Sequence, residues 1–507
     1  MGMEKKMFVI ESEDELQGTP VYYKFINGKR MYTTQPDQYS IKVIRRRVKN
    51  METDKEFCLD MTEKQNERFM TLEPQLGVKY VMEKNGAKTT FSIFMTEQDK
   101  EIEGLKDIVV PDTISLNDVS DYFYAKGVVG EEKNKRAILL AILARKCVGL
   151  EGMSGSGKSY QADAILKLFP KSFIYEMGLQ SNLANWYDRE EINKAHILYI
   201  TELQKAANNL ELIETLKNIG EGKPITRKVT NKQRNGVDEL TIDSKDKIFF
   251  YTLAFENKAE VDTELGRRRL EFITDISNEQ TRTILEDKIK RRYFGIDKKI
   301  LDPKVIKKHI LDVWNLKAKT IIPYGQSIIE KIPPKILSRT YTDHLLDLIE
   351  ACAKFNYKNR ITDNGVIYAD IEDLKIVMDC YGEQFVKSIY NIPIGGDLVL
   401  NKMKDLENSG KANVTPNELQ NYIMDVDLAG ANLKEVLKKL EIAGFISENP
   451  DKTYSLISTL DSKIIFTDED LANSSEKFFD SKKELMEKWF TKNHIKVDNY
   501  IRGDTNE

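Results

Sequence analysis

A glycine-rich loop at residues 152–159 constrains this chain more than any other feature. It reads Gly-Met-Ser-Gly-Ser-Gly-Lys-Ser and fits the pattern G-x-x-x-x-G-K-S. Glycines at this spacing let backbone N–H groups turn inward around a phosphate chain. Lys158 is expected to reach the β- and γ-phosphates, and the Ser159 hydroxyl to bind Mg²⁺. The loop therefore predicts a site for ATP and Mg²⁺, with contacts from Gly152, Met153, Ser154, Gly155, Ser156, Gly157, Lys158, Ser159 and Tyr160.

The sequence on both sides of the loop supports this interpretation. Residues 147–150 form a short apolar run that suits a buried strand. Residues 160–169 have the pattern of an amphipathic helix, which Pro170 ends. The N-terminus of such a helix directs its partial positive charge at the phosphates. The alternative is a glycine–serine turn that fits the pattern by chance, and the flanking strand and helix disfavour it.

Composition indicates a globular protein. The 507 residues are 31% charged and 41% hydrophobic. The longest apolar run, residues 137–144, is too short to cross a membrane, and the N-terminus lacks the apolar run of a signal peptide. Four scattered cysteines form no CxxC pair, which predicts a reducing cytoplasm and no structural zinc. The net charge of −4 means that any DNA contact must come from local basic clusters.

The pattern along the chain predicts an α/β protein with several parts. Helices and buried strands alternate over residues 120–300, which is typical of a nucleotide-binding core with a parallel sheet and flanking helices. A β-rich domain at 1–115 is expected to contain strands near 21–26, 41–48 and 78–82, with hairpin turns at 27–28 and 85–86. The run Arg45-Arg46-Arg47 could bind a nucleic-acid backbone, but a solvated edge strand is favoured. The remaining parts are a helical lid at 301–388, a small domain at 392–460 and a charged tail at 461–507.

A second buried strand predicts part of a catalytic site. The apolar run 195–200 ends in Thr201-Glu202. In P-loop ATPases such a strand lies beside the P-loop strand and ends in an Asp that helps to hold Mg²⁺, often followed by a Glu that polarises the attacking water. Glu202 is present here, and Thr201 replaces the Asp, so its hydroxyl is expected to hold a Mg²⁺-bound water without adding charge. The alternative is an ordinary strand followed by a solvated Glu.

Two further segments extend the predicted site. The strand at 248–253 ends near Thr252, and either Thr252 or Asn257 could orient the hydrolytic water; the residues alone leave both open. Arg267, Arg268 and Arg269 then precede an apolar strand, which suits an arginine finger that stabilises charge on the transferring phosphoryl group. A solvated basic turn is the alternative.

A basic segment between these strands is a candidate DNA contact. Residues 223–236 contain five Lys and Arg and no acidic residue, and 225–230 and 237–242 are expected to pair as strands. A basic hairpin tip contacts phosphates without recognising sequence. A surface hairpin without a ligand is the alternative. The expected DNA-binding residues are Arg227, Lys228, Lys232 and Arg234.

In the order of these motifs the chain resembles the AAA+ ATPases, and among them the minichromosome maintenance helicases and related viral or plasmid replicative helicases, over residues 125–460. Residues 152–159 match the Walker A motif, and 197–202 resemble Walker B. Residues 265–267 resemble the family's Leu-x-Arg finger, which makes Arg267 the preferred finger. The resemblance further implies a DNA hairpin at 223–242, an adenine-side contact at 130–140, and a second-sensor helix that makes Arg339 a γ-phosphate contact.

The resemblance implies an ATP-dependent DNA helicase or translocase that forms a homo-oligomeric ring, expected to be hexameric, acts on single-stranded or forked DNA, and hydrolyses ATP between subunits. Two departures stand out: the Walker B aspartate is missing, and the N-terminal region is short and lacks zinc cysteines. The alternatives are an origin-binding initiator or helicase loader that uses ATP as a switch, and a nucleotide-gated scaffold with weak hydrolysis.

The small domain at 392–460 has a pattern of its own. Thr415 to Glu418 form a capping box, and Leu433, Val436, Leu437 and Leu440 make one apolar helical stripe before Gly444. A strand, a turn and a second strand follow at 445–457. This order resembles a winged helix, and whether it binds DNA or docks a protein stays open. His196 and His344 are expected to be structural.

Overall fold

The computed structural model divides the chain into two compact units, Met1–Gly104 and Leu105–Glu507. The structure describes residues 4–26, 29–51, 55–75, 78–85, 88–93, 97–177, 188–206, 210–231, 236–254, 265, 268–295, 300–393, 395–425, 432–480 and 482–494. No helix among these residues is both long enough and apolar enough to cross a membrane.

The first unit is an antiparallel sheet of seven strands. The order is β3-β2-β4-β1-β6-β7, with β5 also paired to β4. The strands predicted near 21–26, 41–48 and 78–82 are confirmed as β2, β4 and β6. Next to the predicted turns, β2 pairs with β3 and β6 pairs with β7. The strands are β1 (Glu4–Val9), β2 (Thr19–Ile26), β3 (Lys29–Thr33), β4 (Ile41–Asn50), β5 (Glu56–Met61), β6 (Lys79–Asn85) and β7 (Lys88–Ile93).

Helices α1 (Glu13–Gln17) and α2 (Glu63–Met70) cover one face of this sheet, where Phe8 and Phe69 belong to its buried core. A third helix, α3 (Glu97–Glu103), ends the unit. The prediction that Arg45–Arg47 lie on a solvated edge strand is wrong, because β4 pairs with β1, β2 and β5. Arg46 is 1% exposed and donates to Asn66 Oδ1 at 2.7 Å and to the carbonyl of Leu16 at 3.2 Å.

The second unit is built on a sheet of five parallel strands in the order β14-β8-β13-β10-β9. The strands are β8 (Cys147–Gly152), β9 (Ile174–Met177), β10 (Ile197–Ile200), β13 (Ile248–Ala254) and β14 (Arg269–Ile273). The prediction that β10 lies beside the P-loop strand β8 is wrong, because β13 separates them. Every residue of β13 is apolar or buried, and a strand of that kind needs a neighbour on both sides.

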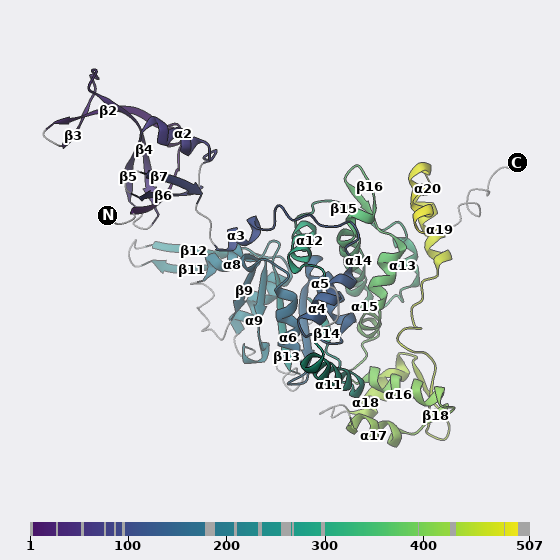
Figure 1. Cartoon of the computed structure of the whole chain (residues 1–507). Helices are drawn as coiled ribbons and strands as arrows, with labels where there is room; N and C mark the ends of the chain where they lie inside the picture. Colours follow the sequence, from purple (N-terminus) through teal and green to yellow (C-terminus); the bar gives the residue numbers. More distant parts are fainter. Residues whose placement is uncertain are drawn as a thin grey trace, which may run out of the picture. The chain divides into compact units, whose positions relative to one another are not determined.

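Helices surround this sheet and share one hydrophobic core with it. Helix α5 (Glu132–Leu143) packs on β8 and β14 and also contacts α14 (Ser338–Phe355) and α15 (Ile371–Tyr390) (Figure 1). This position explains why all of its residues from Ala137 to Leu143 are buried. The other helices near the sheet are α4 (Leu116–Ala125), α6 (Lys158–Leu166), α8 (Arg189–Lys194), α9 (Leu210–Gly220), α11 (Asn278–Tyr293) and α12 (Pro303–Asn315).

The region expected to be a purely helical lid also contains a small sheet. Strands β15 (Lys319–Ile321), β17 (Val366–Tyr368) and β16 (Ile361–Asp363) pair in that order, beside α13 (Gly325–Lys331). Each strand has only three residues, too few to show a period of two in the sequence.

The small domain has the predicted elements in the predicted order. Its four core leucine and valine positions on α18 are buried, and Thr415 and Glu418 form the expected capping box. The elements are α16 (Gly396–Asn408), β18 (Asn413–Val414), α17 (Pro416–Asp425), α18 (Leu433–Ile442), β19 (Ile446–Glu448) and β20 (Tyr454–Leu456), with the strands paired in the order β18-β20-β19.

The segment predicted to be a charged tail folds into two helices, α19 (Asp468–Phe479) and α20 (Lys483–Lys492). Trp489 is fully buried, and its indole Nε1 donates to the carbonyl of Ala369 at 3.0 Å. Asn493 accepts from the backbone N–H of Ile371 at 2.8 Å. Phe479, Trp489 and Phe490 of this segment belong to the main core.

Candidate functional site

The glycine-rich loop connects the end of β8 to the start of α6, as predicted. Gly155 and Gly157 have φ angles of 79° and 86°, which favour glycine, and a Cβ on either would meet no atom within 4 Å. Lys158 is the first residue of α6, and its ammonium donates to the carbonyls of Gly152 at 2.9 Å and Met153 at 2.5 Å. The loop therefore curls around the lysine and leaves open space beside its two left-handed glycines.

Thr274, which the sequence did not single out, supports the first turn of this loop. Its hydroxyl donates to Ser156 Oγ at 2.8 Å. A Cβ on Gly152 would lie 1.9 Å from Thr274 Oγ1, so any larger residue here would displace the Thr274 side chain. Thr274 directly follows β14. It thus joins the end of β14 to the glycine-rich loop.

Thr252 and Glu202 come together at the same edge of the sheet. Glu202 follows β10 and has a left-handed φ of 56°. Its backbone N–H donates to the hydroxyl of Thr252 at 3.1 Å, and Thr252 is 1% exposed. Thr201, next to Glu202, is half-buried at the tip of β10. Thr252 therefore holds the backbone of Glu202 by a hydrogen bond. Asn257, the other residue predicted at this strand tip, lies outside the described residues.

The three arginines before β14 have different surroundings. Arg268 donates through Nε to Glu221 Oε1 at 2.9 Å. Arg269 is 5% exposed, and its Nη2 donates to Glu151 Oε1 at 2.5 Å. The alternative of a solvated basic turn is therefore wrong for Arg269. Arg267, the preferred finger, lies outside the described residues.

Glu151 joins three strands beneath the glycine-rich loop. It is fully buried, immediately precedes Gly152, and accepts from Arg269 of β14 and from the Tyr251 hydroxyl of β13 at 3.3 Å. A Cβ on Gly149 would lie 2.7 Å from both Arg269 Nε and the Tyr251 ring, so glycine makes room for this cluster. Burial raises the pKa of the Tyr251 hydroxyl well above its usual value, which keeps it protonated as a donor.

The predicted basic hairpin forms, but acidic residues offset part of its charge. Strands β11 (Ile225–Asn231) and β12 (Gly236–Ile242) form the predicted antiparallel pair. Arg227 makes an ion pair with Glu211 of α9 at 2.6 Å, and exposed Lys228 lies directly opposite Glu239. Residues 223–236 contain no acidic residue, but Glu211 of α9 and Glu239 of β12 lie next to their basic side chains in the fold. Lys232 and Arg234, the other two residues predicted to bind DNA, lie outside the described residues.

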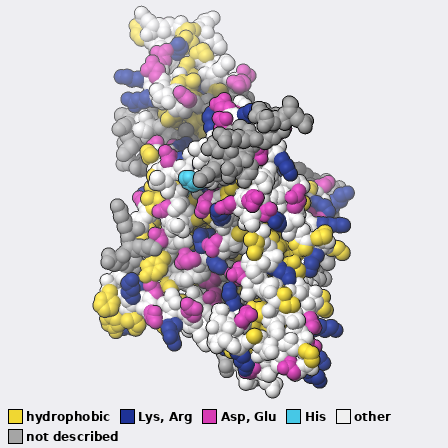
Figure 2. Space-filling model, turned by 90° about the vertical axis from the view of Figure 1, so that its right-hand side faces the viewer, with side chains coloured by type: hydrophobic (Ala, Val, Ile, Leu, Met, Phe, Trp, Pro, Cys, Tyr) yellow, Lys and Arg dark blue, Asp and Glu magenta, His cyan; other side chains and the backbone are white. Residues whose placement is uncertain are grey.

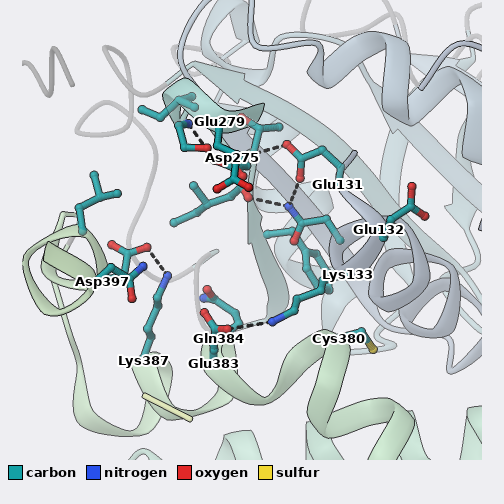
Figure 3. Close-up of a pocket in the computed structure, with 18 of the residues that line it drawn as sticks. Glu131, Glu132, Lys133, Asp275, Glu279, Cys380, Glu383, Gln384, Lys387 and Asp397 are labelled. Carbon is teal, nitrogen blue, oxygen red and sulfur yellow. Dashed lines mark hydrogen bonds and ion pairs between the residues drawn. The ribbon is translucent and has the colours of Figure 1, made fainter. Parts of the chain in front are cut away.

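A cavity of about 520 Å³ adjoins the site (Figure 3). It lies between the N-terminus of α5, the residues that follow β14, and helices α15 and α16, and Thr274 is part of its wall. Two ion pairs cross it, Lys133 with Glu383 at 3.0 Å and Lys387 with Asp397 at 2.5 Å. Its wall is rich in acids: Glu131, Glu132, Asp275, Glu279, Asp379, Glu383 and Asp397.

Glu131 connects two sides of this cavity. One carboxylate oxygen accepts from the backbone N–H of Asp275 at 2.6 Å, and the other accepts from Asn134 Nδ2 at 2.6 Å. Burial raises the pKa of the Glu131 carboxyl to about 7, against those hydrogen bonds, which lower it. The predicted adenine-side segment therefore has a carboxyl group that titrates near neutral pH.

The remaining predicted residues lie apart from these contacts. Arg339 is exposed on the first turn of α14 and is not part of the cavity wall. The ring of His196 packs against Phe173 and Trp314, and His344 is 7% exposed in α14, which agrees with structural roles. Among the described residues, no group of three or more His, Cys, Asp and Glu side chains is arranged to hold a metal ion.

The open loop, the inward lysine and the adjoining cavity together fit a molecule that has a phosphate chain and a ring system. Neither a protein-family model nor a curated protein sequence matches this chain.

Proposed function

We propose that this chain is an ATP hydrolase of the AAA+ class that acts as a ring-forming DNA helicase or translocase in replication, resembling the minichromosome maintenance helicases. The observation that carries the proposal is the glycine-rich loop. Gly155 and Gly157 leave open space at the N-terminus of α6, where Lys158 begins the helix. This is the arrangement that binds phosphates through backbone N–H groups and the helix dipole.

The position of β13 supports hydrolysis as well as binding. Its tip lies between the P-loop strand and the strand that ends before Glu202. Thr252 holds the Glu202 backbone in place. In the proposed site Lys158 binds the β- and γ-phosphates and Glu202 orients the attacking water. Mg²⁺, held by Ser159 and through water by Thr201, would neutralise charge on the phosphates.

The cavity beside the loop is the proposed place for the base and ribose. Its volume of about 520 Å³ is within the usual range of small-molecule sites, roughly 300–1,000 Å³. The Thr274–Ser156 hydrogen bond makes its wall continuous with the glycine-rich loop. The family resemblance implies an adenine contact from residues 130–140, and Glu131 to Asn134 form one side of this cavity.

The surroundings of the arginines support Arg267 as the finger. Arg268 is paired with Glu221, and Arg269 is buried against Glu151. The family resemblance places the finger at Arg267, and the partners of Arg268 and Arg269 disfavour those two residues, so Arg267 is the one proposed to enter the site of a neighbouring subunit. A ring in which ATP is hydrolysed between subunits follows from that role.

DNA is the proposed substrate along which this ATPase moves. On the face drawn in Figure 2, Lys and Arg side chains are interspersed with Asp and Glu, so a nucleic acid would be held by local features. The hairpin β11–β12 is the proposed moving contact, and Lys228 is exposed on β11. Hydrolysis would shift this hairpin along single-stranded or forked DNA.

An initiator or helicase loader is the second candidate, and two observations favour it. The hairpin is less basic than its linear sequence, because Arg227 is paired with Glu211 and Lys228 faces Glu239. The small domain has the element order of a winged helix, a fold that recognises duplex DNA, and Lys434 and Lys438 are exposed on α18.

The first experiment measures ATP hydrolysis by the full chain with single-stranded, duplex and forked DNA. Lys158→Ala should abolish turnover in every case and leave the fold intact. Lys167→Ala, which removes an exposed lysine at the end of the same helix, is the matched control and should retain full activity. Unchanged turnover in Lys158→Ala would remove the basis of the proposal.

The DNA arms separate the candidates. Strongest stimulation by forked DNA, with strand separation, supports the helicase. Tight binding to one duplex sequence without unwinding supports the initiator. ATP binding without phosphate release, in a chain that hydrolyses nothing under any condition, supports the scaffold and ends the helicase proposal.

A further inference from the structure

The first unit has an exposed aromatic face that the ATPase does not explain. Helices α1 and α2 cover one face of its sheet, so side chains on the other face point away from that core. On this second face, at the β3–β2–β4 end, Phe25 is 60% exposed, Tyr32 48% and Ile41 41%. The register confirms that they share a face, because Tyr23 lies opposite Tyr32 on β3 and opposite Ile41 on β4.

Guanidinium groups lie among these rings. The Arg30 guanidinium is 4.3 Å from the centre of the Tyr23 ring, and that of Arg45 is 4.0 Å from the centre of the Tyr32 ring. The Tyr23 and Tyr32 rings are 6.0 Å apart, and Phe25 lies 5.6 Å from Tyr23. The result is one continuous layer of aromatic rings and planar cations.

Asp60 holds this layer in order. It is mostly buried and accepts from Arg45 through two bonds of 2.8 and 3.1 Å, and from Tyr32. Arg30 is its third partner, at 3.4 Å. One carboxylate therefore holds two guanidinium groups and one ring. The cluster keeps a net positive charge. Because its side chains are already ordered, less conformational entropy is lost when a ligand binds.

The segment that forms this face is rich in basic residues, and few of them are neutralised by buried ion pairs. Residues 19–49 contain eight Lys and Arg and one acidic residue, in a chain whose net charge is −4. Arg46 is buried on the other face. Arg47 lies on the same face of β4 as Arg45, and its ion pair with Glu56 is exposed. Such a pair contributes little energy, so a phosphate group can replace the carboxylate.

We propose that this face, named here the β2–β3–β4 face and formed by Tyr23, Phe25, Arg30, Tyr32, Ile41 and Arg45, binds single-stranded nucleic acid. Unpaired bases stack on the exposed rings and guanidinium planes, and the backbone phosphates contact the cations around them. Such platforms bind single strands with little sequence preference because every base has a flat face. A duplex hides those faces and binds less well.

The test is fluorescence anisotropy with labelled 20-nucleotide oligo(dT) and oligo(U) and a duplex of equal length. The full chain is used without ATP and with the Lys158→Ala change, so that turnover plays no part. Phe25→Ala/Tyr32→Ala should weaken binding to both single strands by about tenfold or more. Tyr293→Ala/Phe294→Ala removes two aromatic rings that are 68% and 80% exposed on and after α11, and this control should bind as before.

Two more variants keep the test sharp. Phe25→Ala alone removes a ring that makes no hydrogen bond to Asp60, so it weakens binding without disturbing the layer. Arg30→Glu reverses one exposed charge and should weaken binding and flatten its dependence on salt. Equal binding of oligo(dT) and oligo(U) is expected; a preference identifies which of the two nucleic acids the face selects.

Unchanged affinity in Phe25→Ala/Tyr32→Ala, or no binding of single strands by the full chain, overturns the inference. The inference also fails if Lys228→Glu abolishes binding while Phe25→Ala binds as before. That result would assign the contact to the β11–β12 hairpin and would leave the proposed function unchanged. If the variants change only the elution volume in size-exclusion chromatography, the face docks protein. If the chain binds single strands at this face but hydrolyses no ATP under any condition, the proposed function is wrong and this inference still holds.

Discussion

The hydroxyl of Thr252 accepts a hydrogen bond of 3.1 Å from the backbone N–H of Glu202, across the tips of two neighbouring strands. Glu202 has a left-handed φ of 56°, an arrangement that costs energy for a residue with a Cβ and persists only where its surroundings hold it. Thr252 is therefore the support for the residue proposed to prime the water.

Thr252→Val keeps the shape of the side chain and removes this acceptor. A buried N–H left without a partner costs about 1–3 kcal/mol, so Glu202 should shift and ATP turnover should fall by roughly tenfold or more. Binding of a fluorescent ATP analogue should stay the same. Thr252→Ser retains the hydroxyl and should recover most of the turnover; equal activity in the Val and Ser variants would show that the bond does not matter.

Arg267→Ala should lower turnover by a factor on the order of 10³ with nucleotide binding intact. The same change at Arg268 should have a smaller effect, because that side chain is engaged by Glu221. Mixing Arg267→Ala with Lys158→Ala subunits checks the role between subunits. Some mixed interfaces then contain both an intact loop and an intact finger, so activity should return; two inactive proteins that stay inactive when mixed would argue against a shared site.

Removing one member of the Glu151–Arg269 ion pair should destabilise the fold more than removing both. Both side chains are buried, at 0% and 4% exposure. Glu151→Gln removes the buried partner of Arg269 and leaves its guanidinium only the longer contact with Glu271, at 3.4 Å. A loss of about 3 kcal/mol in the free energy of unfolding is expected. Glu151→Met/Arg269→Met removes both charges and should be more stable than Glu151→Gln. Denaturant unfolding measures the difference, and additive losses would mean that the two charges do not interact.

Gly149→Ala should destabilise the second unit by about 1–3 kcal/mol, because the added methyl group enters a filled space. It would lie 2.7 Å from Arg269 and Tyr251. Gly325→Ala is the matched control, since the nearest atom to its added Cβ is 4.0 Å away. Thermal unfolding of the two variants should therefore diverge, and a silent Gly149→Ala would contradict the packing described for this cluster.

Glu131 predicts a pH dependence with a definite sign. Burial raises its pKa in the folded protein to about 7, above the ordinary value of 4.5. The folded state then binds more protons than the unfolded state between these values, so stability falls as pH rises from about 4.5 to 7, by roughly 3 kcal/mol at most. Glu131→Gln removes this penalty. Its melting temperature should fall less between pH 5 and 8 than that of the unchanged chain, and parallel curves would count against the raised pKa.

The glycine-rich loop and its neighbours could be predicted from sequence because local rules govern them. Residues 147–150, 197–200 and 248–253 are apolar runs with the length of buried strands and too short for typical helices, and the loop pattern fixes its own backbone. The four apolar positions on α18 follow a helical period, and the structure buries all four. In each of these segments the local pattern agrees with the tertiary fold.

Partners that come from distant segments could not be predicted. The insertion of β13 between β8 and β10 depends on strand order, which apolar runs do not encode. Arg46 looks like part of a surface charge run, and only the pairing of β4 with three strands shows that it is buried beside Asn66. Thr274 has no motif, and its contact with Ser156 depends on where β14 ends.

The packing of α19 and α20 changes how shortened chains should be interpreted. Because Trp489 lies in the core and donates to Ala369, trimming the last forty residues would open the middle of the protein and unfold it. Loss of activity in such a deletion would report damage to the scaffold, so any regulatory meaning assigned to this end of the polypeptide needs point substitutions on its solvent side.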